Sequence, residues 1–169
     1  MAARCPGNHE ECKITVSMLS IQKDEHYMDQ ALLEAQKAYD LGEVPVGAII
    51  VSGNKVLARA HNQVEMLTDV TAHAEMIALT AAQNFLSTKY LKSCRLYVTL
   101  EPCCMCAGAL YWSQISEVIV GARDPKRGFS QVGRELIHPK TQLKWDVKPM
   151  ECSSLVQRFF EEMRGNNLK

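Results

Sequence analysis

Hydrophobic residues recur with two different periods along this chain, and the periods distinguish helices from strands. After Asp24 the apolar positions come every three or four residues as far as Gly42, which predicts an amphipathic helix that Asp24 caps. Residues 44–51 and 55–60 are apolar runs, and the Ser-Gly-Asn sequence at 52–54 between them predicts a β-hairpin.

The second half of the chain alternates strand and helix patterns. Helical periodicity covers residues 72–85. Residues 95–100 and 117–121 are predicted strands on either side of a helix that begins near Pro102, which makes a parallel βαβ unit with a right-handed crossover. We expect a last short strand at residues 147–150. This order of elements predicts the α/β class.

The two ends of the chain differ in pattern. Residues 151–164 predict a helix with an apolar stripe, and Phe160 falls at the edge of that stripe, so we expect it to be partly exposed. The stripe consists of Cys152, Leu155, Val156, Phe159 and Met163. Residues 1–23 carry no sustained apolar period, so we interpret them as a flexible extension and residues 24–169 as one domain.

Composition favours a soluble, cytoplasmic protein without membrane association. The chain has seven cysteines, an odd number, and three of them are grouped rather than spread as a disulfide framework. No run of about 18 apolar residues suggests a membrane span. The 19 basic and 19 acidic residues balance, but residues 123–148 hold seven cations and three anions, a modest basic segment whose simplest interpretation is a solvated loop.

Two short motifs carry the chemistry. His73-Ala-Glu75 is followed later by Pro102-Cys-Cys-Met-Cys106. A catalytic zinc has three protein ligands and keeps its fourth position for a water that it acidifies. We predict that His73, Cys103 and Cys106 are those ligands, that one zinc binds per chain, and that Glu75 is the acid/base.

Helix geometry supports this assignment. At about 100° per residue Cys103 and Cys106 lie about 60° apart, so both fit one face of a first helical turn after Pro102, with Cys104 as a spacer. His73 and Glu75 address one site only at a helix start, which Thr71 as N-cap permits.

Simpler interpretations exist for each half of the motif. A Cys-x-x-Cys pair alone is compatible with a redox pair or half of a structural zinc site, and a lone buried histidine is more often a core residue. The two motifs occur together and in order, each before an apolar run, which favours the catalytic zinc.

Longer blocks allow a family comparison. From about residue 26 to 164 the chain resembles the bacterial tRNA-specific adenosine deaminases of the cytidine deaminase-like superfamily. The matching blocks are residues 43–48, 72–75, 96–103, 105–109 and 121–124.

The resemblance implies a three-layer α/β/α fold with a mixed sheet of about five strands, a homodimer, and hydrolysis of the wobble adenosine of a tRNA anticodon stem-loop to inosine with release of ammonia. Glu75 would move the protons of that reaction. The substrate contacts that the resemblance implies are Asn62 at the flipped nucleoside, Val46 and Ala74 in the base pocket, and Arg123 and Asp124 beside the target base; we add Lys126 and Phe160 as further candidates.

One segment departs from the family pattern. Residues 128–131 read Gly-Phe-Ser-Gln where the family commonly has a run of small residues. Phe129 either stacks on a splayed base or packs at the dimer interface.

Two other functions compete with tRNA deamination. A deaminase of free guanine, cytosine or a nucleoside would use the same zinc site. A non-catalytic, zinc-stabilised RNA-binding module would not need Glu75, because a structural site has no use for a carboxylate beside an open coordination position.

Overall fold

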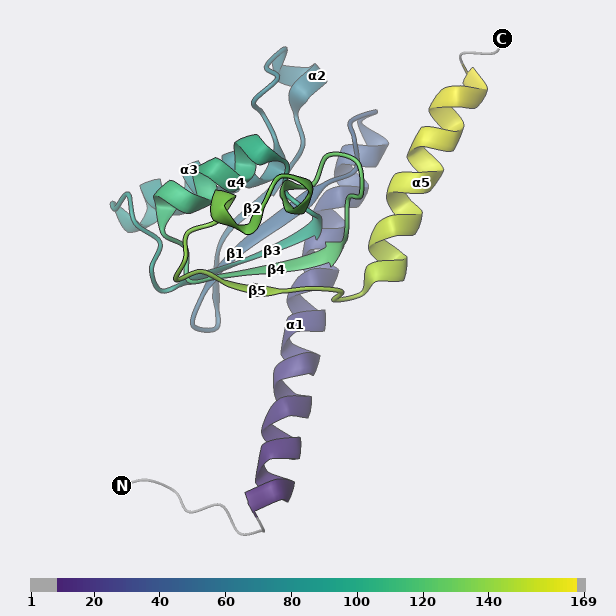
Figure 1. The fold of residues 1–169 in the computed structure, drawn as a ribbon. Helices are drawn as coiled ribbons and strands as arrows, with labels where there is room; N and C mark the ends of the chain where they lie inside the picture. Colours follow the sequence, from purple (N-terminus) through teal and green to yellow (C-terminus); the bar gives the residue numbers. More distant parts are fainter. Residues whose placement is uncertain (1–8, 167–169) are drawn as a thin grey trace.

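A single mixed sheet organises the protein. The computed structural model describes the backbone of residues 9–166 and the side chains of residues 24–165. The strands run in the order β2-β1-β3-β4-β5 (Figure 1), with β1 antiparallel to both neighbours and β3, β4 and β5 parallel. Their bounds are β1 Gly47–Ser52, β2 Lys55–His61, β3 Cys94–Leu100, β4 Glu117–Ala122 and β5 Gln142–Lys144. The predicted hairpin, parallel βαβ unit and five-stranded sheet are confirmed.

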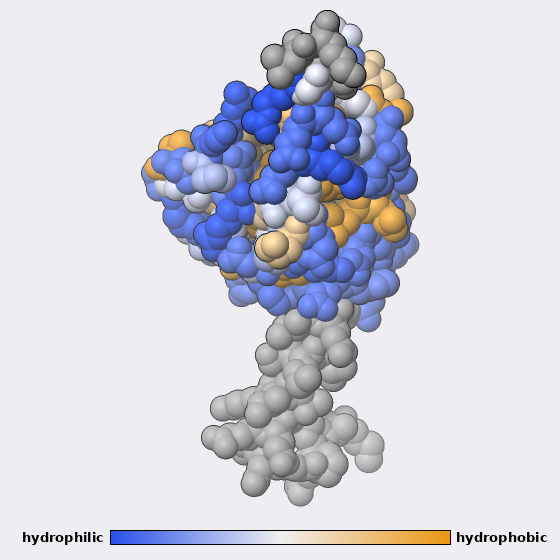
Figure 2. Space-filling model, turned by 90° about the vertical axis from the view of Figure 1, so that its right-hand side faces the viewer, coloured by the Kyte–Doolittle hydropathy of each residue, from blue (hydrophilic) through white to orange (hydrophobic). Residues whose placement is uncertain are grey.

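Helices cover both faces of the sheet. Helices α3 and α4 lie on one face and α1 and α5 on the other (Figure 1), which confirms the three-layer α/β/α fold. Figure 2 shows that the side of the molecule that carries α5 is mainly hydrophilic, with a few hydrophobic patches. No helix in the described residues is apolar over enough length to cross a membrane. The helix bounds are α1 His9–Asp40, α2 Val64–Leu67, α3 Ala74–Leu86, α4 Cys104–Ser113 and α5 Pro149–Asn166, with 3₁₀ helices η1 Phe129–Gln131 and η2 Arg134–Leu136.

Successive residues of the strand β1 enter different cores. In β1, Ala48 and Ile50 pack with α3 and α4, whereas Ile49 and Val51 pack with α1. At the start of β1 a Cβ atom on Gly47 would lie 2.0 Å from the backbone oxygen of Ala31, so only glycine permits this close approach of α1. The sheet thereby has two apolar faces, each sealed by helices.

Asp24 is not a helix cap. Helix α1 runs from His9 through Asp24, so the predicted N-cap is wrong, and residues 1–8 lie outside the described residues. Asp24 is 6% exposed; it accepts a hydrogen bond of 2.7 Å from the hydroxyl of Tyr97 and pairs with Lys144. These sheet residues explain why a carboxylate occurs there.

The two metal-site helices begin later than predicted. Helix α3 starts at Ala74 with His73 as N-cap, because the Thr71 hydroxyl donates to Asp69 instead of capping the helix. Helix α4 starts at Cys104 with Cys103 as N-cap, so Pro102 precedes the helix rather than opening it. In both cases the predicted ligand lies at the helix start.

The last strand was placed wrongly. Residues 142–144 form β5, and residues 147–150 do not form a strand. Val147 is buried and its backbone N–H donates to the Val120 carbonyl, so it joins the sheet edge through one bond before Pro149 opens α5. Val147 is apolar because it is buried in the connection between β5 and α5, and the sequence pattern of such a residue resembles that of a short strand.

Candidate active site

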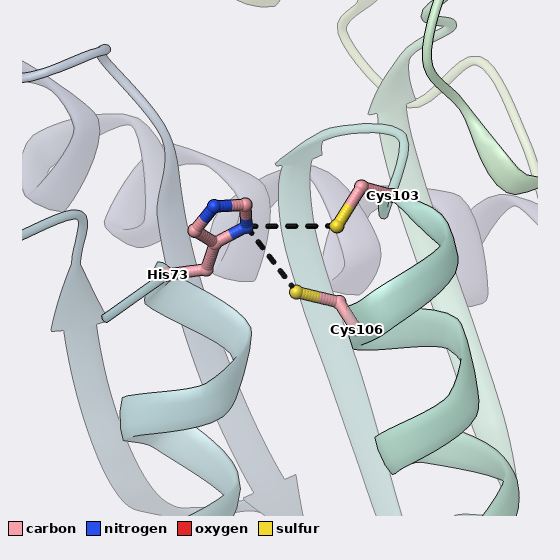
Figure 3. Close-up of side chains that lie close together, drawn as sticks. All are labelled: His73, Cys103 and Cys106. Atoms are coloured by element: carbon pink, nitrogen blue, oxygen red, sulfur yellow. Dashed lines mark hydrogen bonds between the residues drawn. The ribbon is translucent and has the colours of Figure 1, made fainter. Parts of the chain in front are cut away.

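Three side chains from two helix starts converge at the carboxyl end of β3. His73 precedes α3, Cys103 precedes α4 and Cys106 lies in the first turn of α4, and Figure 3 shows all three pointing toward one another. His73 Nδ1 lies 3.6 Å from Cys103 Sγ and 3.5 Å from Cys106 Sγ. The predicted ligand set is thus assembled by the fold, and the spacer Cys104 is exposed.

These distances fit a tetrahedral zinc ion. Zn–N and Zn–S bonds of about 2.05 and 2.3 Å at a tetrahedral angle separate nitrogen from sulfur by about 3.6 Å. The observed separations are 3.6 and 3.5 Å, and all three ligand atoms lie within 4.8 Å of one another. No fourth ligand joins these three among residues 24–165, whose side chains the structure describes, so one coordination position is left for water or substrate.

The ligand set also has the charge that a cation requires. The pKa of Cys103 is lowered to about 4, first because of the hydrogen bond with the Cys106 thiol, and also because of the hydrogen bond with His73; burial opposes both. Because the two cysteines share a proton, the same pairing raises the pKa of Cys106. The pocket therefore stabilises a thiolate, the form that binds zinc.

Glu75 lies beside the three ligands without being one of them. It is 3% exposed, and its Oε2 has no hydrogen-bond partner among the side chains and backbone that the structure describes. Burial raises the pKa of Glu75 to about 7. An unsatisfied buried carboxylate oxygen costs about 1–3 kcal/mol, so its presence requires an explanation, and a bound water or substrate would supply the missing partner.

Asn62, Val46 and Ala74 adjoin this centre through hydrogen bonds. The side-chain oxygen of Asn62 accepts the Ala74 backbone N–H at 2.9 Å, and the backbone N–H of Asn62 donates to the Val46 carbonyl at 3.2 Å. Asn62 therefore supplies the capping interaction at the start of α3 that Thr71 was expected to supply. All three residues are buried.

The basic segment is largely committed to internal contacts. Arg123 pairs with Asp146, Lys144 with Asp24, and Lys148 with Asp29. Arg134 donates to three backbone carbonyls. Within the described part of the chain, the cations of this segment that make no ion pair and no such contact are Lys126, Arg127 and Lys140.

Asp124 shapes the loop that follows β4. Its carboxylate accepts the backbone N–H groups of Lys126 and Arg127 at 2.9 and 3.0 Å, and both of those side chains are exposed. The structure therefore gives Asp124 a turn-forming role, and leaves Lys126 available to a partner.

Phe129 and Phe160 have different environments. Phe129 is 1% exposed and stacks on Trp145 with ring centroids 5.7 Å apart, so both expectations for it, a base-stacking platform and a dimer contact, are wrong. The loop turns its ring inward because it fills the core beside α4. Phe160 is 46% exposed on α5, as its place at the stripe edge predicts.

Sequence reasoning assigned no role to two buried glutamates. Glu43 is 2% exposed and accepts the Met66 backbone N–H at 2.9 Å, which fixes α2. Glu101 is 4% exposed and binds the loop after β4. The sequence does contain a feature that could have identified them: each carboxylate lies directly beside an apolar segment, where burying an unpaired charge is costly and a partner is therefore expected.

The fold and this site together define a zinc-dependent deaminase of the cytidine deaminase-like class. Residues 21–122 match the family described as the cytidine and deoxycytidylate deaminase zinc-binding region. The chain is 47% identical to the tRNA-specific adenosine deaminase of Aquifex aeolicus, covering 84% of this chain and 97% of that protein. It is 42% identical to the protein of the same name from Bacillus subtilis, covering 84% and 91%.

A solved structure of a tRNA:A34 deaminase gives the same result. It superposes with a TM-score of 0.72 at 36% identity, covering 77% of this chain and 98% of that one. The chain belongs to the tRNA-specific adenosine deaminase family.

Proposed function

We propose that this protein hydrolyses the wobble adenosine of a tRNA anticodon to inosine and releases ammonia. The observation that carries the proposal is Glu75, a buried carboxylate with an unpartnered oxygen beside a three-ligand metal site. A structural zinc site would leave that carboxylate without a purpose. The substrate class follows from relatives named as tRNA-specific adenosine deaminases that align along nearly their whole length.

His73, Cys103 and Cys106 would hold the zinc. When bound, zinc lowers the pKa of a coordinated water so that a hydroxide nucleophile is available near neutral pH for attack at C6 of adenine. Glu75 would accept the first proton of the attacking water and deliver it to the ring nitrogen, and would then accept the second proton, from the oxygen now on C6, and deliver it to the amino group, which leaves as ammonia.

Base recognition would fall to the buried residues around this centre. Val46 and Ala74 would line the base pocket. Asn62 has its side-chain oxygen bound to the Ala74 N–H, which leaves its amide NH₂ to donate to a nucleoside. Lys126 and Arg127 on the loop after β4 would bind phosphates, and Arg123, Asp124 and Phe160 would lie at the RNA surface.

The test is inosine formation in an anticodon stem-loop. The zinc-loaded protein is incubated with a stem-loop that has adenosine at the wobble position, with the same loop carrying guanosine there, and with free adenosine, guanine and cytosine. We expect inosine in the first RNA alone and far slower reaction of free adenosine, which lacks the remote contacts that offset unstacking. Comparable kcat/KM for free guanine or cytosine without inosine in the stem-loop would refute the assignment.

We also propose that the protein is a homodimer that associates through α4. Met105 and Trp112 are seven residues apart and hence about 20° apart around the helix. They are 37% and 77% exposed, so together they present a small apolar surface on one face of α4 that a second copy of the chain would cover. Sedimentation velocity should give a dimer for the wild type and a monomer for Trp112→Glu, and a monomeric wild type would contradict the proposal.

A further inference from the structure

Glu101 joins the metal-site turn to the loop that follows β4. It comes directly before Pro102 and Cys103, at the end of β3, and its side chain is buried at 4% exposure. Its Oε2 accepts the Asp124 backbone N–H at 3.1 Å, and its Oε1 accepts the Ser130 backbone N–H at 2.9 Å. One carboxylate therefore binds both ends of the segment 124–130.

The surrounding backbone fits closely around this carboxylate. A Cβ atom on Gly128 would lie 2.3 Å from the Glu101 carboxyl carbon, so any larger residue at position 128 would displace the Glu101 carboxylate from its present position. The Phe129 backbone N–H donates to the Pro102 carbonyl at 2.9 Å, and Cys103 forms an isolated β-bridge with Gly128. The loop is thus bound to the same turn that carries a metal ligand.

The loop exposes two of the three cations of the basic segment that internal contacts leave available, Lys126 and Arg127. The Asp124 carboxylate accepts the backbone N–H groups of Lys126 and Arg127, and the Asp124 backbone N–H itself donates to Glu101. These hydrogen bonds determine where Lys126 and Arg127 lie. Charge-assisted hydrogen bonds that backbone N–H groups donate to a carboxylate are short and strong. The position of both cations relative to the metal site depends on them.

We propose that Glu101 is a positioning residue for the RNA substrate: it holds the loop 124–130 so that Lys126 and Arg127 face the phosphates beside the target nucleotide. The inference rests on the proposed function for the identity of the ligand. It assigns Glu101 no contact with the reacting atoms. Its effect therefore appears in substrate binding and in the order of the loop, not in metal loading.

The direct test is Glu101→Gln in the zinc-loaded protein. The variant keeps the shape of the side chain, but one of the two carboxylate oxygens is replaced by an NH₂ group that faces a backbone N–H. One of the two hydrogen bonds from the loop to residue 101 is therefore lost. Hydrogen exchange of residues 121–132 should accelerate about tenfold or more, because local opening no longer breaks two charge-assisted bonds. Zinc content should stay at about one per chain, as a three-ligand site requires.

Kinetics separate positioning from a general structural effect. KM for the stem-loop should rise about tenfold, because the loop must be ordered at each binding event, while kcat changes less than about threefold. In a Lys126→Ser/Arg127→Ser background, Glu101→Gln should raise KM by less than about twofold, since it acts through those residues. Affinity for a fluorescent stem-loop is measured in parallel.

A matched control is Glu34→Gln. Glu34 is similarly buried, at 5% exposure, but its partners are the Lys37 and His61 side chains on α1 and β2. We expect this variant to lose stability without changing the exchange of residues 121–132 or the KM for RNA.

The outcomes are distinguishable. Unchanged exchange, an unchanged KM, a KM rise that persists undiminished in the double-serine background, or loss of zinc together with kcat would each overturn the role of Glu101. If Glu101→Gln does not fold, Glu101→Asp, which keeps the charge but is too short to reach both N–H groups, is judged by the same criteria. Absence of inosine with the wild type would refute the proposed function instead, while the exchange and affinity ratios still decide the role of Glu101.

Discussion

Replacing Phe129 by alanine tests whether the residue belongs to the core or to the RNA surface. Its ring is 1% exposed and stacks on Trp145 at 5.7 Å. Truncating a buried phenylalanine costs about 3–5 kcal/mol, which combines lost burial with the cavity that remains. For a protein of this size each kcal/mol lowers Tm by about 2–4 °C, so a loss of 3 kcal/mol corresponds to roughly 6–12 °C. Urea unfolding of the zinc-loaded protein, monitored by circular dichroism, gives the free-energy difference.

Val132→Ala is the matched control for this experiment. Val132 directly follows η1 but is 62% exposed, so its truncation should change stability by no more than about 0.5 kcal/mol. A loss below about 1 kcal/mol for Phe129→Ala, accompanied by weaker stem-loop binding at full folding, would refute the core assignment. Such a result would mean that the ring leaves the core and stacks on RNA.

Four further variants address the metal centre and the packing of α1 on the sheet. Glu75→Gln should retain about one zinc per chain but lose about 10²–10⁴-fold in kcat, since proton transfer is removed while the ligands stay; near-normal turnover would contradict the acid/base role. Cys106→Ala should lose zinc, measured by mass spectrometry of the metal, whereas Cys104→Ser should keep it, and metal loss from the latter would show that the ligand assignment is wrong. Gly47→Ala should lower Tm, because its Cβ would lie 2.0 Å from a backbone oxygen of α1; an unchanged Tm would show that α1 can shift at little cost.

Local chemistry made much of this structure predictable from the sequence. The hairpin, the βαβ unit and the three converging ligands depend on periodicities and helix geometry that span only a few residues each. Pro102 and the cysteine spacing placed the ligand turn within two residues of its observed position. The predicted helix caps Thr71 and Asp24 were wrong for another reason. The Thr71 hydroxyl donates to the nearby Asp69, and the Asp24 carboxylate accepts from the distant Tyr97, so neither side chain caps a helix.

Long-range contacts explain what the sequence could not predict. The Glu101 hydrogen bonds span 23 and 29 residues, and no local pattern records that a strand-end carboxylate will meet two N–H groups of a later loop. The same holds for Phe129, whose partner Trp145 comes from the connection after β5. An aromatic residue in a polar loop has the same sequence signature whether it faces the core or the solvent.

Sequence and structure differ in how many cations of residues 123–148 are available to bind RNA. From the sequence, the excess of cations over residues 123–148 is modest, and its simplest interpretation is a solvated loop. In the structure Arg123, Lys144 and Lys148 pair with acidic partners, so the cations left available are Lys126 and Arg127 on the loop after β4, together with Lys140. Electrostatic attraction that depends on few cations is effective only if they are held in register with the phosphates. Under the proposed function, a protein with no net charge binds RNA through the position of a few cations rather than through total charge, and the proposed role of the buried Glu101 is to set that position for Lys126 and Arg127.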